Sequence, residues 1–367
     1  MAATPVDPRV ADHHRQVMLA LPGNGNSAEH AHGVAAAETL EAAAVDVGRF
    51  ACRPASQVYF IPGASAALWL AIEDVIATSA RPPRIVASAA EHPSLLAHLR
   101  QAEAEGRAAV TIFAVDAAGL PRLDALAKAL VGGADLVCAM AANNEVGTIT
   151  AMGPIATQAR DAGARLLVDA SQVAGRSAMT DYGVANYLVL SGAKMYGPRR
   201  VGVLVGDIGE KARFRGETLF GSPDVAAASA MAKACTLRAE ERDMDEARIG
   251  TMRDRLQSLL VDAIPDLVVN GTGARRVAGS LHISVPDMPG EAVVARLWNK
   301  VSLSTGAACQ SGAPGPSHVL LAMGVTEWIA DGAVRIGVGR FNQPEEMDEA
   351  GAFIAAAMLP EDMRRRA

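Results

Sequence analysis

Aromatic residues are scarce in this chain, since Phe, Trp and Tyr together make up 4% of its 367 residues. Half of the residues are nevertheless apolar, so the core is expected to be largely aliphatic. The sequence also lacks an apolar run long enough to cross a bilayer, and its start lacks the basic and apolar regions of a signal peptide. These absences argue against a membrane-spanning protein and a secreted one.

Cysteine is scarce too, and the spacing of the four cysteines forms neither a CxxC pair nor a zinc-binding pattern. We expect free thiols in a reducing compartment, and the cytoplasm is the simplest such compartment. The formal net charge of −6 is mild. It argues against nucleic acid or an anionic membrane as a partner held by bulk electrostatics.

The length predicts two lobes, because 367 residues exceed the usual range of one domain. Between about residues 57 and 205, short apolar runs alternate with amphipathic stretches. This alternation predicts an α/β fold, with a mostly parallel seven-stranded sheet covered by helices on both faces. The predicted strands are 58–61, 84–87, 110–113, 136–139, 166–168, 187–190 and 201–204, and the predicted helices are 64–78, 93–105, 122–131 and 154–162.

The pattern changes after residue 225. A long helical stretch from Val225 to about Leu260 predicts a connector between the lobes, or two successive helices. Beyond it, apolar runs at 280–285 and 333–338 are interspersed with helix-like segments near 290–300, 315–324 and 344–357. This mixture predicts a smaller α+β domain. We expect the large domain to comprise residues 15–245, and the small domain to comprise residues 1–14 and 246–367.

Polar residues directly after the predicted strands are the first candidates for a site, because ligands of open α/β sheets lie beyond the carboxyl ends of the strands. Ala64 and Ser65 follow the first strand at the start of a helix, where backbone N–H groups can bind an anion. A tight turn with Ser65 as the helix cap is the simpler interpretation. His92 follows the second strand, where a lone histidine is more often a capping or surface residue.

A carboxylate and an amine are also expected at this edge of the sheet. Asn144 follows one strand in a segment that could equally be a turn. Asp169 and Gln172 follow the next strand, and a buried carboxylate needs a cationic partner, although Asp169 could be a helix cap. Ser191 and Lys194 come after the strand that follows. A lysine between small residues at a strand end is poorly placed as a surface charge and well placed to bond a ligand.

An amine nucleophile, a carboxylate and a phosphate-sized anion site are the parts that a pyridoxal-phosphate enzyme needs. In such a site Lys194 forms a Schiff base, Asp169 pairs with the pyridinium nitrogen, and the anion site holds the phosphate. Lysine–aspartate pairs without a cofactor are common, so only the complete set of residues supports this prediction.

The second half of the chain adds a thiol and a guanidinium. Cys309 lies in a segment rich in Gly, Ser, Ala and Pro, which predicts a loop, and it alone is presented as a nucleophile would be. Cys52, Cys138 and Cys235 lie in or near apolar segments and are expected in the core. Arg335 lies within an apolar strand. A buried guanidinium needs an anion, which could be a substrate carboxylate or a structural Asp or Glu.

These residues resemble a known family, the cysteine desulfurases of the class V aminotransferase group, which have the fold of type I pyridoxal-phosphate enzymes. The resemblance extends over nearly the whole chain. Its most specific segments are 143–147, 168–172, 191–198 and 304–309, and residues 335–341 resemble the closing strand of the family.

The resemblance implies a role for each candidate around the cofactor, pyridoxal 5'-phosphate. Lys194 resembles the Schiff-base lysine, and Asp169 would pair with the pyridinium nitrogen. Asn144 and Gln172 would bond the side of the ring that carries the hydroxyl. His92 would stack on the ring and serve in proton transfer.

The resemblance also implies how phosphate and substrate are held. Ala64, Ser65 and Ser191 would hold the phosphate, and Ser222 would reach the phosphate of the neighbouring subunit, which implies a homodimer. Arg335, with Asn144, would bind the carboxylate of the substrate L-cysteine. Cys309 would attack the sulfur of L-cysteine.

The resemblance thus predicts a cysteine desulfurase, which converts L-cysteine to L-alanine and carries the sulfur on Cys309 as a persulfide for an acceptor protein. Another pyridoxal-phosphate lyase, such as a selenocysteine lyase, is one alternative, and dependence on Cys309 separates the two. A catalytically weakened scaffold homologue in a sulfur-transfer complex is a second alternative. It is motivated by Ala66, Trp69 and Ala193, which replace a Glu, an Asn and a His of the family pattern.

Overall fold

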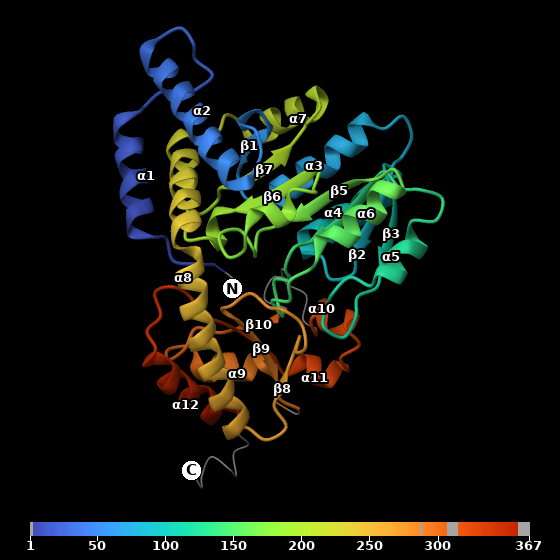
Figure 1. Cartoon of the computed structure of the whole chain (residues 1–367), viewed down its shortest axis with the longest axis vertical. Coiled ribbons are helices and arrows are strands. Elements are labelled where there is room, and N and C mark those ends of the chain that lie inside the picture. Colours follow the sequence, from blue (N-terminus) through green and yellow to red (C-terminus); the bar gives the residue numbers. More distant parts are fainter. Residues whose placement is uncertain (1–2, 287, 307–314, 359–367) are drawn as a thin grey trace.

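The structure is a computed structural model that describes residues 3–286, 288–306 and 315–358. Two sheets organise it, one of seven strands and one of four. The helix α8 (Val225–Ala263) runs without interruption from the larger sheet to the smaller one (Figure 1). Of the two interpretations that the sequence allowed for this stretch, the single connecting helix is correct.

The larger sheet confirms the predicted α/β fold. Its strand order is β1-β7-β6-β5-β4-β2-β3, in which the pairs from β3 to β6 are parallel and β7 is antiparallel to both neighbours. The strands are β1 (Val58–Ile61), β2 (Arg84–Ser88), β3 (Ala109–Phe113), β4 (Leu136–Met140), β5 (Arg165–Asp169), β6 (Tyr187–Ser191) and β7 (Gly202–Gly206).

Helices cover both faces of this sheet, because successive strand side chains point to opposite faces and both sets are apolar. Val137 and Ala139 of β4 enter one core, and Leu136 and Cys138 enter the other. The first core is closed by α2 (Ala31–Ala51), α5 (Leu123–Ala129), α6 (Met152–Asp161) and the first half of α8. The second core is closed by α3 (Ala64–Thr78), α4 (Pro93–Ala104) and α7 (Glu210–Phe220).

The smaller sheet is antiparallel and has the order β10-β11-β9-β8. Its core is formed with α9, α12 and the second half of α8. The strands are β8 (Val268–Val269), β9 (Ser280–Ser284), β10 (Ser304–Thr305) and β11 (Ala333–Gly337), and the helices are α9 (Gly290–Leu297), α10 (His318–Ala322), α11 (Glu327–Asp331) and α12 (Glu346–Met358). This arrangement confirms the predicted α+β composition of the smaller part.

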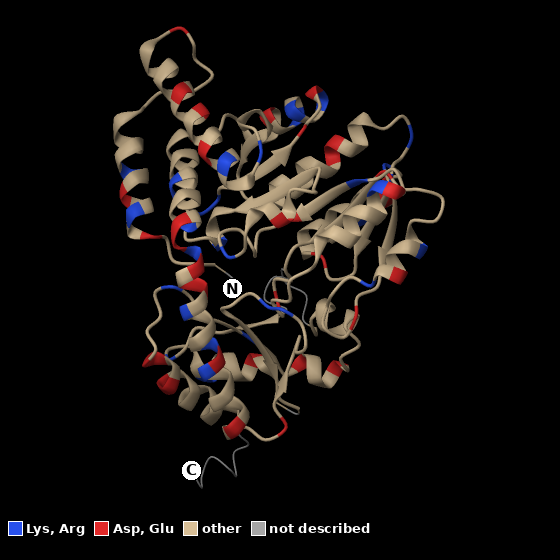
Figure 2. Cartoon of the chain, in the orientation of Figure 1, with Lys and Arg blue, Asp and Glu red and all other residues tan. Residues whose placement is uncertain are grey.

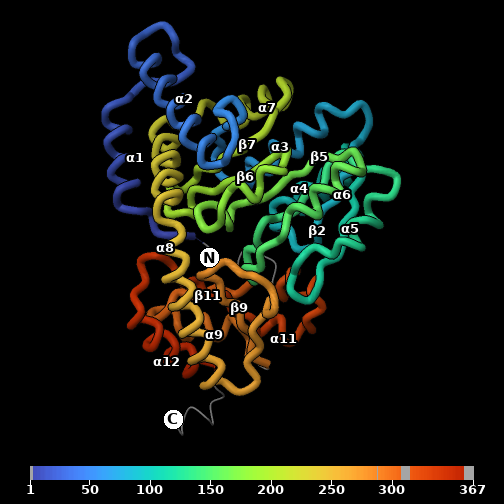
Figure 3. Tube along the Cα trace, viewed as in Figure 1, coloured from blue at the N-terminus to red at the C-terminus, as the bar shows by residue number. Residues whose placement is uncertain are grey.

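Elements near the N-terminus pack against the first half of α8. The helix α1 (Pro8–Ala20) begins after Asp7, whose side chain accepts the N–H of Arg9 and caps the helix. The trace in Figure 3 shows α1 and α2 beside one half of α8, and α12 beside its other half. Short 3₁₀ turns lie at η1 (Ala55–Gln57), η2 (Met179–Tyr182) and η3 (Gly192–Lys194).

Cysteine placement follows the prediction in two of three cases. Cys138 and Cys235 are buried, whereas Cys52 is exposed. The prediction for Cys52 is wrong because α2 ends at this residue, in a left-handed conformation with φ 56°, and the apolar stripe of the helix does not continue. Cys309 lies outside the described residues.

Charged residues lie mostly on helices and loops, and Figure 2 shows both signs along the middle of α8. Among the described residues, no helix is long and apolar enough to cross a membrane.

Candidate active site

A cavity of about 230 Å³ lies at the carboxyl edge of the larger sheet, facing β11 of the smaller sheet. The loops after β1, β2, β4, β5 and β6 all reach it, as the parallel arrangement of these strands requires. Of the residues predicted from the sequence, its lining contains Ala64, Ser65, His92, Asn144, Asp169, Gln172, Ser191, Lys194 and Arg335. The lining also contains Leu68, Ser94, Met140, Ala142, Ser171 and Ala193.

The amine reaches the cavity through a tight turn after β6. Ser191 is the last residue of β6, and Lys194 ends the 3₁₀ turn η3. Gly192 permits this turn, since a Cβ at this position would lie 2.6 Å from the backbone oxygen of Pro198. Arg176 donates to the backbone oxygen of Lys194 at 2.9 Å and so holds the end of the turn.

The carboxylate of Asp169 closes β5, the strand next to β6 in the sheet. Its Oδ1 accepts the backbone N–H of Ser171 at 2.9 Å, and the residue is 7% exposed. The hydroxyl of Ser171 is buried and has no hydrogen-bond partner among the described residues. Ser171 was not predicted from the sequence, although it lies between Asp169 and Gln172 in one of the segments that carry the family resemblance.

Asn144 presents a buried amide to the cavity. Within the described part of the chain, neither its Oδ1 nor its Nδ2 has a hydrogen-bond partner. The neighbouring Asn143 fixes the loop instead, because its Oδ1 accepts the N–H groups of Glu145 and Val146 at 2.8 and 3.0 Å. Since a buried amide without partners is costly, Asn144 is suited to a polar ligand in the cavity.

His92 serves as a helix cap and also lines the cavity. Its Nδ1 accepts the backbone N–H of Ser94 at 3.1 Å at the start of α4. Because Nδ1 acts as an acceptor, the neutral ring carries its proton on Nε2. The capping interpretation of this histidine is therefore correct, and it does not exclude a second role at the cavity.

Ser65 is not a helix cap. The cap position of α3 is Gly63, with φ 105°, and no side chain caps this helix. A Cβ at Gly63 would meet no atom within 4 Å, so the space in front of the helix start is open. The positive end of a 15-residue helix therefore faces the cavity beside Ser65.

Arg335 is the residue that the smaller sheet contributes. It is 3% exposed, and its Nη1 and Nη2 donate to the backbone oxygen of Asn144 at 2.9 Å and to Ser304 Oγ at 3.1 Å. No Asp or Glu of the described residues forms an ion pair with it. Glu145 acts on this guanidinium only through its charge and not through a direct ion pair, so an anion in the cavity remains a candidate partner.

Two buried glutamates near the cavity were not predicted. Burial, followed by the charge of Asp169, raises the pKa of Glu91 to about 8, so this carboxyl is mostly neutral at pH 7. Burial also raises the pKa of Glu145 to about 7, although the hydrogen bond from Ser317 and the charge of Arg335 act against it. Each glutamate adjoins a predicted residue, His92 or Asn144, but sequence alone does not reveal how deeply a carboxyl is buried.

Ser222 lies outside this cavity. Its hydroxyl accepts a hydrogen bond from Asn26 Nδ2 at 3.0 Å, and it lines two other hollows, near β1 and the end of α7. The family resemblance implies that Ser222 serves the neighbouring subunit, and that role stays a prediction.

The sheet order and a cavity at the strand ends that is lined by both Lys194 and Asp169 point to a class of protein. This chain belongs to the aminotransferase class-V family, whose model matches residues 1–349. A cysteine desulfurase IscS from Anaeromyxobacter dehalogenans (strain 2CP-C) is 33% identical over 366 residues, covering 95% of this chain and 89% of the relative. A cysteine desulfurase from Rattus norvegicus is 31% identical over 364 residues, covering 95% and 79%. A solved NifS-like protein has a TM-score of 0.85 at 26% identity and covers 96% of each chain.

The family uses pyridoxal phosphate, and the residues of the cavity fit this group. An amine (Lys194), a buried carboxylate (Asp169) and the uncapped start of α3 supply the three features that the cofactor needs. The polar atoms of Asn144 and Ser171 that lack partners among the described residues are the second observation that favours a bound ligand.

Proposed function

We propose that this protein is a cysteine desulfurase, which releases L-alanine from L-cysteine and holds the sulfur on Cys309 as a persulfide for an acceptor protein. The observation that carries the proposal is the convergence of Lys194, Asp169 and Arg335 on one cavity. Lys194 and Asp169 come from adjacent strands of the larger sheet, whereas Arg335 comes from the smaller one. The cavity would therefore combine a site for a pyridoxal group with a cation that can bind the carboxylate of an amino acid.

Each side chain would have one task. When bound, pyridoxal phosphate supplies an aldehyde for amino groups and a ring that accepts the electron pair left by a departing α-proton. Lys194 would bind the aldehyde, and Asp169 would accept the hydrogen bond of the ring nitrogen. Ala64, Ser65 and Ser191 would hold the phosphate. Gln172 and Asn144 would bond the side of the ring that carries the hydroxyl.

The substrate would be held by its carboxylate. Arg335 would donate to the carboxylate of L-cysteine, with the amide of Asn144 beside it. Lys194 or His92 would move the α-proton. The thiolate of Cys309 would then attack the substrate sulfur, so that an S–S bond forms, the C–S bond breaks and alanine is left.

The alternative of a weakened scaffold homologue rests on three substitutions, and two of them lie away from the cavity lining. Ala66 does not line the cavity, and neither does Trp69, whose ring packs against Phe220 and His98 at 5.7 and 6.0 Å between centroids. Ala193 does line it. Loss of one phosphate contact there would weaken cofactor binding without removing a reacting group.

We also propose that the protein acts as a homodimer, in which Ser222 reaches the phosphate in the neighbouring subunit. Its position outside the cavity of its own chain supports this arrangement. Light scattering of the purified protein should give twice the monomer mass. Replacing Ser222 by Ala should weaken cofactor binding without changing that mass. A monomer that retains full activity would contradict the dimeric arrangement.

The decisive experiment is to measure alanine release from L-cysteine by the purified protein supplied with pyridoxal phosphate and a reductant that clears the persulfide. Release at enzymatic turnover would support the proposal. If the cofactor absorbance is present but no alanine forms, the protein acts on another substrate, and selenocysteine is then the first to test. If the protein binds no cofactor at all, the scaffold alternative replaces the proposal.

A further inference from the structure

Tyr196, which follows Lys194 by two residues, is held by the N-terminal segment. It is buried and has a left-handed backbone conformation with φ 62°. Its N–H donates to Thr4 Oγ1 at 2.8 Å, and its backbone oxygen accepts the N–H of Asp7 at 2.9 Å. Thr4 also donates twice to the backbone oxygen of Ala193, from N at 2.9 Å and from Oγ1 at 3.2 Å. Residues 4–7 therefore fix the turn that carries Lys194 on both sides of the lysine.

The side chain of Tyr196 reaches the segment that follows β11. Its hydroxyl accepts the backbone N–H of Arg340 at 2.9 Å, and its ring meets that of Phe341 edge to face, 5.7 Å between centroids. Arg335 lies on β11, so the tyrosine joins the lysine turn of the larger part to the strand that carries the guanidinium.

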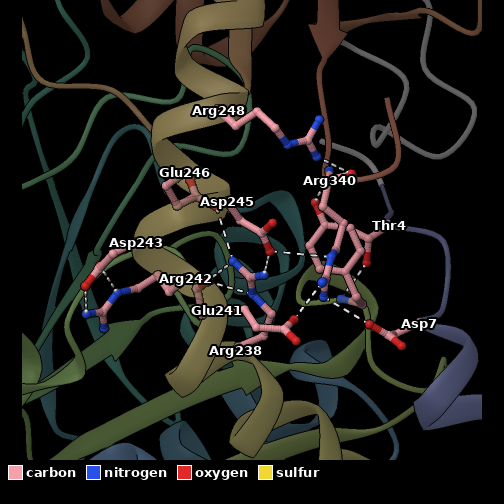
Figure 4. A network of polar contacts seen from close by, with 12 residues as sticks. Thr4, Asp7, Arg238, Glu241, Arg242, Asp243, Asp245, Glu246, Arg248 and Arg340 are labelled. Atoms are coloured by element: carbon pink, nitrogen blue, oxygen red, sulfur yellow. Dashed lines mark hydrogen bonds and ion pairs between the residues drawn. The ribbon is translucent and has the colours of Figure 1, made fainter. Parts of the chain in front are cut away.

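Two guanidinium groups contact the ring of Tyr196. Arg238 and Arg340 lie 5.4 and 5.5 Å from its centroid, within the range of cation–π attraction. Arg238 is 1% exposed and donates to the backbone oxygen of Gly175 at 2.9 and 2.8 Å. Figure 4 shows Arg238 and Arg340 among the acids that pair with them, which are Asp7, Glu241, Asp245 and Glu246.

These contacts stabilise the place where the larger part, the N-terminal segment and the smaller part meet around Tyr196, which we call the junction. Each buried guanidinium is paired with a carboxylate or a carbonyl oxygen, so displacing it would leave a charge without compensation. The acids come from α8 and from the start of α1, whereas Arg340 comes from the smaller part. Three segments far apart in the sequence therefore meet around one tyrosine ring.

We propose that Tyr196 is a positioning residue that holds Lys194 and Arg335 at a fixed separation, and thereby sets how tightly the cavity binds its substrate. The proposal rests on the proposed function, because it assigns Arg335 to the substrate carboxylate. Lys194 and Arg335 line the same cavity from different sheets. Tyr196 does not itself line the cavity, but its backbone N–H is hydrogen-bonded to Thr4 and its hydroxyl accepts the N–H of Arg340, in the segment that follows β11.

The test uses Tyr196→Phe, which keeps the ring in contact with both guanidinium groups and deletes only the acceptor of the Arg340 N–H. The KM for L-cysteine should rise about three- to tenfold, the loss expected for one hydrogen bond. The kcat should change by less than about twofold and the cofactor absorbance should persist, because a uniform loss of substrate binding raises KM alone.

The matched control is Tyr187→Phe. Tyr187 is also buried, and its hydroxyl donates to Asp74 Oδ2 at 2.6 Å, at the end of β6 away from the cavity. This variant should lose thermal stability but keep the KM of the wild type. Equal KM values in both variants would overturn the proposal, since Tyr196 would then be an ordinary core residue.

Amide hydrogen exchange gives a readout that does not need activity. In Tyr196→Phe, exchange should accelerate in the segment 338–342 and remain unchanged in the control. A second variant, Thr4→Val, removes the two hydrogen bonds of the Thr4 hydroxyl, to the Tyr196 N–H and the Ala193 oxygen, and should accelerate exchange in 193–197, whereas Thr4→Ser should keep the wild-type rate. Unchanged exchange in both segments would contradict the proposal even if the KM values moved.

The two proposals can fail separately. If the wild type releases no alanine but the exchange pattern is as expected, the proposed function fails and the junction at Tyr196 stands as a structural link. If the wild type is an active desulfurase and Tyr196→Phe changes neither KM nor exchange, the positioning role fails alone.

Discussion

Arg335 Nη1 donates to the backbone oxygen of Asn144 at 2.9 Å, and this hydrogen bond joins β11 of the smaller sheet to the loop after β4 of the larger one. The side-chain amide of the same Asn144 has no partner among the described residues. The guanidinium of Arg335 and the side-chain amide of Asn144 therefore lie at the same part of the cavity. Their N–H groups that are not used within the protein suit a carboxylate.

Replacing Arg335 by Lys should lower kcat/KM for L-cysteine by about 10- to 100-fold, because hydrogen bonds to a charged group contribute about 1.5–3 kcal/mol. An ammonium cannot reproduce the planar fork that reaches Asn144 and Ser304 and still presents donors to the substrate. Most of the effect should appear in KM, measured by steady-state alanine release. The control is Arg255→Lys, at an exposed pair with Asp348, which should leave the kinetics unchanged. Equal kinetics in all three proteins would contradict the assignment of Arg335.

Replacing Asp169 by Asn should leave a protein that binds the cofactor but reacts slowly. The amide has nearly the same shape, and its oxygen can still accept the Ser171 N–H, but it carries no charge to stabilise a protonated ring nitrogen. We expect kcat to fall on the order of 100-fold, as when one electrostatic contact to a developing charge is removed. The rate of α-proton exchange into deuterated water, followed by NMR, isolates this step. An exchange rate equal to that of the wild type would contradict the role.

Replacing Cys309 by Ser should abolish persulfide formation while the cofactor remains bound. Oxygen in place of sulfur is a much weaker nucleophile toward a substrate thiol, so alanine release should fall to background. Mass spectrometry of the wild type after L-cysteine should show one additional sulfur on the peptide with Cys309 and none in the variant. The exposed Cys52 provides the matched control, since Cys52→Ser should behave as wild type. Desulfuration that survives Cys309→Ser would favour the alternative lyase.

The larger sheet was predictable because its strands are buried on both faces and therefore consist of uninterrupted apolar runs. Every predicted strand from 58–61 to 201–204 is present, and α3 begins and ends where the pattern indicated. The helices α1, α2, α7 and the short α11 were not predicted. The sequences of α1 and α7 are polar overall, and these helices depend on packing against α8 or α3 rather than on a strong apolar stripe.

The residues of the candidate site could be predicted from the sequence, but their burial and their contacts could not. Lys194, Asp169 and His92 could be placed at one edge because parallel strands end on the same side of a sheet. The sequence could not predict three other features: the missing partners of Asn144, the burial of Glu91 and the contacts of Tyr196. Each of these depends on segments that are distant in the sequence. Thr4 and Tyr196, for example, are separated by 192 positions.

The raised pKa of Glu91 predicts a pH dependence of stability. A glutamate whose pKa is ordinarily 4.5 titrates at about 8 here, because burial and the charge of Asp169 disfavour its ionised form. Between these two values the folded protein keeps a proton that the unfolded chain has released, so the free energy of unfolding falls as the pH rises. The fall ends above the folded pKa of about 8.

Glu91→Gln should remove most of this dependence and keep the acceptor for the Met140 N–H, which Glu91 Oε1 receives at 2.7 Å. We would measure urea unfolding from about pH 7 to about pH 8.5, above the ordinary histidine pKa, so that a neutral buried histidine such as His282 adds no slope. The wild type should lose stability across this range, and the variant should lose less.

Glu145 titrates at about 7 with the same sign, so a smaller slope should remain in the variant. Glu105, which lies at the surface, supplies the control, because the slope of Glu105→Gln should follow that of the wild type. Parallel slopes in wild type and Glu91→Gln would show that Glu91 is already ionised in the folded protein at pH 7, and the buried negative charge would then need a neighbouring cation to offset it.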